Sequence, residues 1–337
     1  MLILGIETSC DDTGVAVVGD GYKILSNIVF SQEEHKKFSG VVPEIASRKH
    51  LEYIHNLIEK ALSGANILLS DIDAVGVTVK PGLIGSLLVG LSVASTISYL
   101  TGKPLIPVNH IESHIYAASF DNNIDFPFIG LIVSGGHTLL TVWNSWVDKK
   151  IIGTTIDDSV GEAFDKVAKL LDLGYPGGPI IDKIAKGVKE SSVSFPLVML
   201  NNKEDRYNFS YSGLKTSVVY YIRNNREYNK EDVVYSFQKA AIDVLYKKTV
   251  IACKDFNINN VVIGGGVAAN SYLREVFLSD KKLKTFFPSI KLCTDNGVMV
   301  AGLAYYLYKN GIVINDPKSI EPVDKILTYN DKKALRK

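Results

Sequence analysis

The sequence predicts an α/β protein built from two duplicated lobes. A chain of 337 residues is about twice the length of a typical single domain. A β-branched strand, a short polar turn and a second strand occur near the start of each half, at 2–18 and at 128–143. Strand-to-helix junctions follow both hairpins, so the pattern indicates a repeated mixed α/β unit.

In the first half, residues 2–6 and 15–18 are the predicted strands of the hairpin, and the polar residues 7–14 connect them. Apolar residues near helical spacing then predict a helix at 43–62, and a β-branched run predicts a strand at 73–79.

The segment at 81–101 carries no charge and is long enough to cross a membrane. Glycine, serine and threonine residues dilute its apolar character, and neither an aromatic belt nor a basic flank accompanies it. We therefore expect a core helix, opened by Gly82 and Gly85, that is buried on all sides.

In the second half, the hairpin turns at the small residues 134–138. A third glycine cluster, at 264–266, follows a predicted strand at 260–263 and leads into a predicted helix at 270–278. Glycine turns of this kind let backbone N–H groups approach phosphate oxygens, although an ordinary tight turn explains any single one. Together they favour a nucleotide bound in a cleft between the lobes.

Net charge, cysteine content and the N-terminal sequence limit the partners, the metal site and the compartment that we expect. Lys and Arg number 37 against 36 Asp and Glu, so a net charge of +1 offers no whole-surface attraction to nucleic acid. The three cysteines are widely separated and form no CxxC pair, which argues against disulfides and a thiolate zinc site. The N-terminus shows no signal or transit pattern, so we expect a cytoplasmic protein.

His110 and His114 are the strongest candidates for metal ligands. Four residues apart on a helix, they share one face and can hold one ion, although a structural, hydrogen-bonded pair explains the same spacing. Glu112 lies about 200° around the helix from His110, which argues against an H-E-x-x-H protease. Asp295, expected at a strand end before a helix at 298–306, completes a set of two imidazoles and one carboxylate that suits Fe(II) or Zn(II).

Two further regions admit both a functional and a structural interpretation. Asp165 and Asp182 could accept hydrogen bonds from ribose hydroxyls, or belong to an ordinary helix and Gly-Pro bend. The segment 208–216 mixes aromatic and hydroxyl side chains with a lysine, so it could stack on RNA bases or form a simple turn. Cys10 is not expected to be a nucleophile, because no histidine is near it in sequence.

These motifs together resemble the tRNA N6-adenosine threonylcarbamoyltransferase family of the bacterial TsaD type, formerly misnamed O-sialoglycoprotein endopeptidases or glycoproteases. The resemblance extends from residue 2 to about residue 310. The runs that carry it are GIETSCD at 5–11, GVVPEIASR at 40–48, PGL at 81–83, HIESH at 110–114, VSGGHT at 133–138, GEAFDK at 161–166, YPGGP at 175–179, SGLKT at 212–216 and GGGVAAN at 264–270.

The resemblance implies an actin-like ATPase (ASKHA, ribonuclease H-like) superfold with a ligand cleft between two duplicated lobes. It implies transfer of threonylcarbamoyl from L-threonylcarbamoyladenylate to N6 of adenosine 37 of tRNAs that read codons starting with A, which forms t6A and releases AMP. One divalent metal per subunit is implied, Fe(II) or alternatively Zn(II). Implied protein partners are a paralogous TsaB-like subunit and a TsaE-like ATPase.

The resemblance also assigns residues by position. His110, His114 and Asp295 match the metal ligands of the family. Its adenylate contacts are matched by Ile132, Val133, Ser134, Gly135, Gly136, Asp165, Gly178, Asp182 and Asn270. Ser113 and Lys80 depart from the usual family residues; Ser113 is small enough to keep the helix face, whereas Lys80 brings a charge near the cleft.

We expect the first lobe at 1–120, completed by a C-terminal helix at 296–320, the second lobe at 121–295, and a polar tail at 321–337. The tail lacks the Arg- and Trp-containing ending that is common in relatives.

Three other interpretations are weighed: a sugar kinase or Hsp70-like ATPase, a metallopeptidase, and a nucleotide-binding scaffold subunit. The first is disfavoured because its loops usually carry Asp where this chain has Glu7 and Ser134.

Overall fold

The computed structural model describes residues 1–38, 40–199, 203–314, 316 and 321–324. It divides the chain into two compact units, Met1–Asn123 with the described residues from Pro288 onward, and Ile124–Phe287. Residues 288–295 therefore group with the first unit rather than with the second, where the sequence placed them. Most of the predicted tail, from residue 325 onward, lies outside the described residues.

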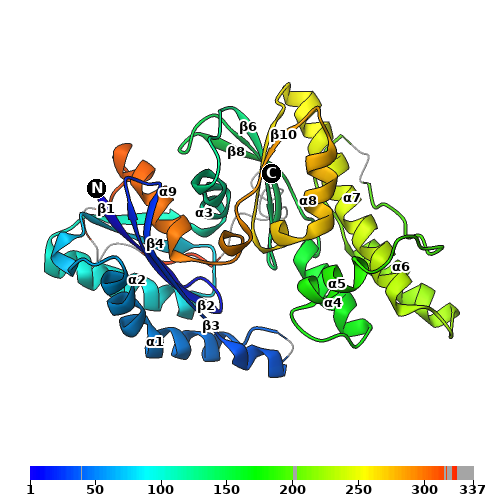
Figure 1. Ribbon diagram of the computed structural model, residues 1–337, viewed down its shortest axis with the longest axis horizontal. Coiled ribbons are helices and arrows are strands. Elements are labelled where there is room, and N and C mark those ends of the chain that lie inside the picture. Colours follow the sequence, from blue (N-terminus) through cyan, green and yellow to red (C-terminus); the bar gives the residue numbers. More distant parts are fainter. Residues whose placement is uncertain (39, 200–202, 315, 317–320, 325–337) are drawn as a thin grey trace, which may run out of the picture. The chain divides into compact units, whose positions relative to one another are not determined.

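The first unit is a five-stranded sheet with helices on both faces (Figure 1). Its strands are β1 (Leu2–Glu7), β2 (Asp12–Gly19), β3 (Lys23–Ser31), β4 (Ala74–Lys80) and β5 (Leu105–Asn109). Its α-helices are α1 (Pro43–Gly64), α2 (Ile84–Thr101), α3 (His110–Tyr116) and α9 (Gly297–Lys309), with 3-10 turns η1 (Glu33–Phe38), η2 (Leu69–Asp71), η3 (Ala117–Phe120) and η5 (Ile290–Leu292).

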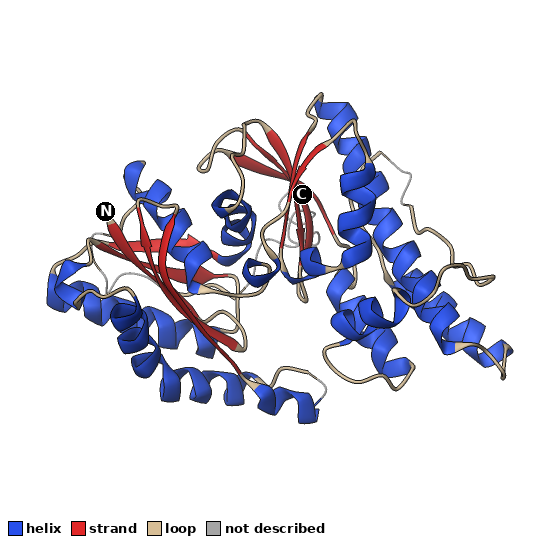
Figure 2. Ribbon diagram, viewed as in Figure 1, coloured by secondary structure: helices blue, strands red, loops and turns tan. Residues whose placement is uncertain are grey.

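The second unit contains the other five-stranded sheet, and Figure 2 shows its helices gathered beside the strands. The strands are β6 (Phe128–Val133), β7 (Thr138–Trp143), β8 (Lys149–Thr154), β9 (Asn260–Gly264) and β10 (Lys284–Phe286). The helices are α4 (Val160–Leu170), α5 (Gly177–Ala185), α6 (Ser212–Asn224), α7 (Lys230–Phe256), the 3-10 turn η4 (Gly266–Ala269) and α8 (Ser271–Ser279).

The two sheets have the same topology. The first has the order β3-β2-β1-β4-β5, with an antiparallel meander over β1 to β3 and with β4 and β5 parallel to β1. The second has the equivalent order β8-β7-β6-β9-β10, again with an antiparallel meander followed by two parallel strands. This equivalence confirms the duplicated α/β unit that the two hairpins predicted.

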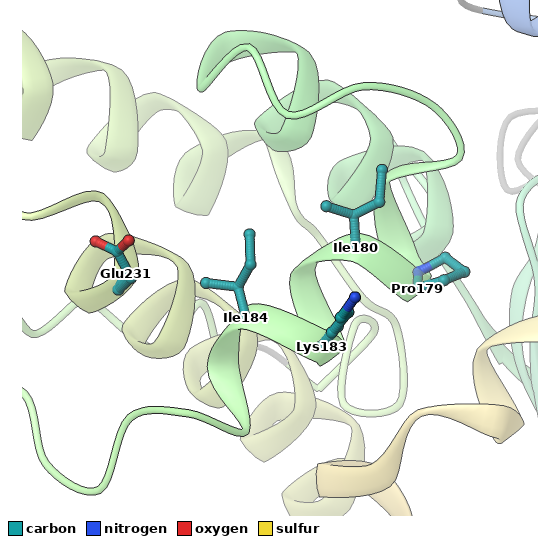
Figure 3. A pocket seen from close by; sticks show the side chains of 5 residues that line it. All are labelled: Pro179, Ile180, Lys183, Ile184 and Glu231. Atoms are coloured by element: carbon teal, nitrogen blue, oxygen red, sulfur yellow. The ribbon is translucent and has the colours of Figure 1, made fainter.

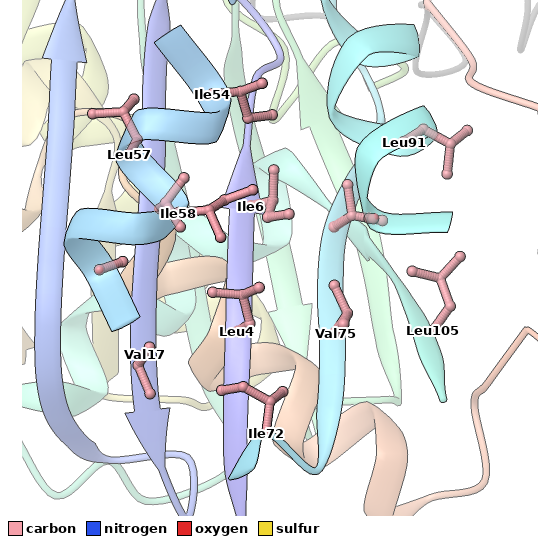
Figure 4. Packing of buried hydrophobic residues seen from close by; sticks show 14 of the residues in the cluster. Leu4, Ile6, Val17, Ile54, Leu57, Ile58, Ile72, Val75, Leu91 and Leu105 are labelled. Atoms are coloured by element: carbon pink, nitrogen blue, oxygen red, sulfur yellow. The ribbon is translucent and has the colours of Figure 1, made fainter. Parts of the chain in front are cut away.

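Alternation along β1 explains how the first sheet is covered on both faces. Leu4 and Ile6 pack with Ile54 and Ile58 of α1 in one apolar cluster (Figure 4). Residues on the opposite face of the strand meet α9, where Gly5 approaches the helix backbone. Because side chains of a strand alternate between its two faces, a continuous apolar run such as LILGI is buried on both sides.

Helix α2 differs from its expectation. Its inner face is buried, but Leu88 is 45% exposed, Tyr99 70% and Leu100 76%. The expectation that this helix is buried on all sides is therefore wrong, because α1 and the sheet cover only one side of it. By length and composition α2 could cross a membrane, but a single helix of this kind is weak evidence for a span.

Helix α9 also differs from the sequence-based bounds. It begins at Gly297 and ends at Lys309, whereas a helix over 296–320 was expected. Asn310 ends the helix, and Ile314 forms an isolated bridge with Leu105 of β5. Farther on, the N–H of Val323 donates to the carbonyl of Val79, so the described part of the C-terminal segment continues along the first sheet.

Candidate metal centre and adenylate-binding residues

Helix α3 places two histidines on one face, as their spacing predicted. His110 is the first residue of the helix, directly after β5, and the side chain of Asn109 caps the helix by accepting the N–H of Ile111 at 2.9 Å. The rings of His110 and His114 lie edge to face with centroids 4.6 Å apart, and both residues are buried.

Asp295 joins these histidines, although it does not end a strand as expected. The residues before it form the 3-10 turn η5, and Asn296 after it caps α9 by accepting the N–H of Met299. Oδ1 of Asp295 lies 3.1 Å from Nε2 of His114 and 3.7 Å from Nε2 of His110. Residues 185 positions apart in the chain thus meet through the packing of α9.

Three glycines allow this packing. A Cβ on Gly5 would lie 2.3 Å from the carbonyl oxygen of Gly297, and a Cβ on Gly14 would lie 2.7 Å from the N–H nitrogen of Gly297. Only glycine permits contacts this close between the first hairpin and the start of α9. Gly5 and Gly14 of this hairpin therefore serve the position of Asp295.

The three side chains fit a metal ion. Their ligand atoms all lie within 4.8 Å of one another, and separations of about 3–4 Å are what ligands near 2.1 Å from a shared ion require. Within the described residues neither ring nitrogen of buried His114 has a hydrogen-bond partner, since the contact with Asp295 is poorly directed. Buried polar atoms without partners are costly, and a metal would satisfy one of them.

Negative charge accumulates around the two imidazoles. Burial alone would raise the pKa of Glu7, but the charge of His110 and the hydrogen bond with it bring that pKa below its ordinary value. Burial would lower the pKa of His110, whereas Asp295 and Glu7 raise it to about 9. Burial and the nearby Asp295 raise the pKa of Asp12 to about 7. A field of this sign attracts a divalent cation.

The predicted adenylate residues all belong to the second unit. Ile132 and Val133 are buried at the end of β6, and the turn Ser134 to Gly136 follows, with the N–H of Ser134 bonded to the carbonyl of His137. The hydroxyl of Ser159, which caps α4, donates to the carbonyl of Gly135.

Close backbone contacts of two glycines bring further elements to this end of β6. A Cβ on Gly265, where φ is +100°, would lie 2.3 Å from the carbonyl oxygen of Val133, and a Cβ on Gly161 would lie 2.5 Å from that of Ser134. The turn after β9 and the start of α4 therefore meet at the end of β6.

Asp165, Asp182 and Asn270 already have structural partners. Asp165 accepts the N–H of Gly177 at 2.7 Å, and burial raises its pKa. Oδ1 of Asp182 accepts both the N–H and the hydroxyl of Ser271, and Asn270 caps α8 while its amide donates to Gln238. These bonds hold α4, α5, α7 and α8 together around the turn after β9.

Four other glycines of this region have open space where a Cβ would lie. A Cβ added to Gly135, Gly136, Gly178 or Gly266 would meet no described atom within 4 Å. Packing therefore does not demand glycine at these four positions. Backbone that is left uncovered in this way is what close approach of a ligand requires.

Two sequence-based alternatives are resolved by the structure. Phe209 and Tyr211 are completely buried, and Lys215 is ion-paired with Asp158 at 2.7 Å, so the segment 208–216 is a packed turn and helix start rather than a base-stacking surface. Burial and the charge of Asp11 raise the pKa of Cys10 far above the ordinary thiol value, which agrees with its rejection as a nucleophile.

A surface depression on α5 is separate from the predicted adenylate residues. It is lined by Pro179, Ile180, Lys183, Ile184 and Glu231 (Figure 3). None of the predicted adenylate residues is among the residues that line it, although Gly178 directly precedes Pro179.

Sequence reasoning missed Glu7 and Ser9, which contact Nδ1 of His110, and Thr78, which donates to Glu7. Glu7 was noted only as part of a motif. The available signal was a carboxylate at the end of an otherwise apolar strand, which requires buried partners.

Solved structures with low sequence identity share the fold. Component A of (R)-2-hydroxyglutaryl-CoA dehydratase from Acidaminococcus fermentans is 14% identical with a TM-score of 0.58, covering 92% of this chain and 98% of that chain. HypF from T. kodakarensis is 15% identical with a TM-score of 0.60, covering 95% of this chain and 49% of that chain. Both are actin-like ATPase-fold proteins, so the predicted superfold is confirmed.

Comparison with known sequences is more specific. The family model for TsaD, tRNA N6-adenosine threonylcarbamoyltransferase, matches residues 23–302. A protein of that name from Sulfurihydrogenibium sp. (strain YO3AOP1) is 54% identical over 309 residues, covering 92% of this chain and 91% of the relative. Another from Brachyspira hyodysenteriae is 50% identical over 312 residues, covering 91% and 92%. The chain therefore belongs to the tRNA N6-adenosine threonylcarbamoyltransferase family.

Proposed function

We propose that this chain transfers threonylcarbamoyl from L-threonylcarbamoyladenylate to N6 of adenosine 37 in tRNAs that read codons starting with A. The observation that carries the proposal is the clustering of His110, His114 and Asp295 in a member of this transferase family. A scaffold that only bound nucleotide would have no need of a buried two-histidine, one-carboxylate cluster.

The proposed reaction is an acyl transfer. The nitrogen N6 of the adenosine attacks the carbonyl carbon of the donor, and a new C–N bond forms. The bond from that carbon to the phosphate oxygen breaks, so AMP leaves with the electron pair and N6 loses one proton. Most of the rate would come from holding the two reactants in line and from stabilising charge on the carbonyl oxygen.

His110, His114 and Asp295 would hold one divalent metal, for which Fe(II) is proposed and Zn(II) is the alternative. When bound, such an ion supplies Lewis acidity for a carbonyl oxygen and a fixed point for orienting the acyl group. The residues themselves contribute rigidity, because α3 and the start of α9 are both anchored on the first sheet.

The second unit would hold the adenosine and phosphate of the donor. The space where a Cβ would lie on Gly135, Gly136 and Gly178 is open, which suits the approach of a phosphate or a ribose to these turns. Asp165 and Asp182 would keep these segments in place through their bonds to Gly177 and Ser271, and their remaining acceptor capacity suits ribose hydroxyls.

Protein partners are part of the proposal: a paralogous TsaB-like subunit and a TsaE-like ATPase, in the cytoplasm. The balanced charge of the chain gives little unaided attraction to tRNA. The uncharged outer side of α2, with Leu88, Tyr99 and Leu100 exposed, is the kind of surface that a protein partner covers.

The test is a mass-spectrometric assay of nucleosides from unmodified tRNA. The chain is incubated with these partners, a divalent metal and donor labelled in the threonine part. Labelled t6A in the tRNA and equimolar AMP support the proposal. Release of AMP with no labelled nucleoside, in a preparation that binds the donor, would refute it.

A further inference from the structure

Glu7 is a carboxylate with no exposed surface, at the last position of β1. Three donors surround it. The N–H of Ser9 lies 2.6 Å from Oε1, whereas the hydroxyl of Thr78 and Nδ1 of His110 lie 2.6 and 3.1 Å from Oε2. None of these partners is a lysine or an arginine, so this buried carboxylate depends on His110 and on the two other hydrogen bonds for its stability.

This arrangement decides which ring nitrogen of His110 carries a proton. An ionised carboxylate can only accept hydrogen bonds, so Nδ1 must be the donor. In the neutral ring Nε2 then has a free lone pair, and Nε2 is the nitrogen that lies 3.7 Å from Oδ1 of Asp295. Ser9 Oγ, at 3.0 Å from Nδ1, can share the same proton.

We propose that Glu7 is a positioning residue that holds His110 in the Nδ1–H tautomer and thereby presents Nε2 to the metal. The inference rests on the proposed metal site. Glu7 is not one of the three clustered ligand residues, so it would act through the ring of His110. His114 has no comparable partner at its Nδ1 among the described residues, so His110 is the ligand whose orientation is fixed in advance.

The variant Glu7→Gln separates tautomer control from simple packing. The backbone N–H of Ser9 cannot be moved, so the amide oxygen of Gln would occupy the Oε1 position and accept it. The NH₂ group would then face Thr78 and His110. The hydroxyl of Thr78 can rotate to accept, but Nδ1 of His110 can accept only if its proton moves to Nε2, the position that the metal needs.

Thr78→Val is the matched control. Thr78 is also completely buried and donates to the same oxygen of Glu7. Valine has nearly the same shape, so this variant removes a hydrogen bond from Glu7 while leaving its charge and its bond with His110 in place. A merely structural role for Glu7 predicts similar effects from both variants, whereas tautomer control predicts a large effect from Glu7→Gln alone.

The experiment is titration calorimetry of the full chain with Zn²⁺, together with thermal unfolding of each variant. We expect one site in the wild type, binding weaker by about 10- to 100-fold in Glu7→Gln, and a change of less than about threefold in Thr78→Val. Equal affinity of wild type and Glu7→Gln would overturn the inference, as would equal losses in the two variants.

If a variant does not fold, a measurement on the wild type still tests the inference. In the Zn²⁺-loaded protein, ¹⁵N chemical shifts of the histidine rings should show a proton on Nδ1 of His110 and the metal on Nε2. Metal on Nδ1 would overturn the inference while leaving the metal site intact. A wild-type chain that binds no Zn²⁺, Fe²⁺ or Co²⁺ would instead refute the proposed metal site itself.

Discussion

Gly177 and Gly178 are neighbours at the start of α5 with opposite surroundings, and they allow the adenylate site to be tested by adding one methyl group. A Cβ on Gly177 would lie 2.5 Å from Cβ of Ala168 and 2.8 Å from the carbonyl oxygen of Phe164. A Cβ on Gly178 would meet no described atom within 4 Å. The two substitutions to alanine should therefore have different effects.

Gly178→Ala should leave the fold intact and weaken donor binding. Alanine is favoured over glycine in a helix by about 0.5–1 kcal/mol, so the unliganded protein should be slightly more stable. If the adenylate packs on this backbone, the extra methyl should cost about 1–3 kcal/mol in the complex, as overpacking does. That cost corresponds to about a 5- to 150-fold increase in the Kd for AMP.

Gly177→Ala should instead destabilise the protein by about 1–3 kcal/mol, because the backbone of α4 must move. The assay is titration calorimetry with AMP, combined with thermal unfolding of each variant. Gly64→Ala at the end of α1 is the control, since its Cβ would meet only Cβ of Ser26 at 3.5 Å. Unchanged AMP affinity in a folded Gly178→Ala variant would refute the placement of the adenylate beside α5.

Three further predictions concern other parts of the molecule. His114→Ala should abolish tight Zn²⁺ binding in calorimetry, and it should lower the free energy of unfolding by about 2–5 kcal/mol because the truncated side chain is buried; retained Zn²⁺ binding in the folded variant would exclude His114 as a ligand. Burial lowers the pKa of Lys248 to about 8, so between pH 8 and 10 the unfolded chain binds more protons than the folded chain. The free energy of unfolding of the wild type, measured by urea titration relative to Lys248→Met, should therefore rise with pH over this range. A wild-type advantage that falls with pH would contradict this. Leu88→Lys should change stability by less than about 0.5 kcal/mol, because the side chain is 45% exposed, but it should reduce partner-stimulated t6A formation; full stimulation would exclude this side of α2 as the partner surface.

Local patterns were sufficient for the two hairpins and for part of the metal site. The two hairpins were predictable because short apolar runs rich in β-branched residues, separated by a polar turn, are typical of paired strands. The pairing of His110 with His114 followed from helical spacing alone.

The position of Asp295 could not be derived in the same way. It depends on how closely α9 approaches the first hairpin, and that approach is set by Gly5, Gly14 and Gly297 rather than by any pattern around Asp295. Spacing within one helix is local information, whereas this contact joins segments about 280 residues apart in the chain.

The exposure of α2 was also beyond the local pattern. A uniformly uncharged helix suggests burial on all sides, but burial is decided by the neighbours that the fold supplies, and within the described part of the chain α1 and the first sheet leave the outer side of α2 exposed. The role of Glu7 was missed for a related reason, because its partners Thr78 and His110 come from two other strands or their ends.

The proposed reaction requires a metal held by His110, His114 and Asp295. This requirement is tested most directly by measuring t6A formation, by mass spectrometry, with metal-stripped wild-type chain before and after Fe²⁺ or Zn²⁺ is restored, in the presence of its partners and labelled donor. We predict that t6A falls to background in the stripped chain and returns in proportion to metal occupancy. Undiminished t6A formation by a chain shown to contain no metal would contradict the account.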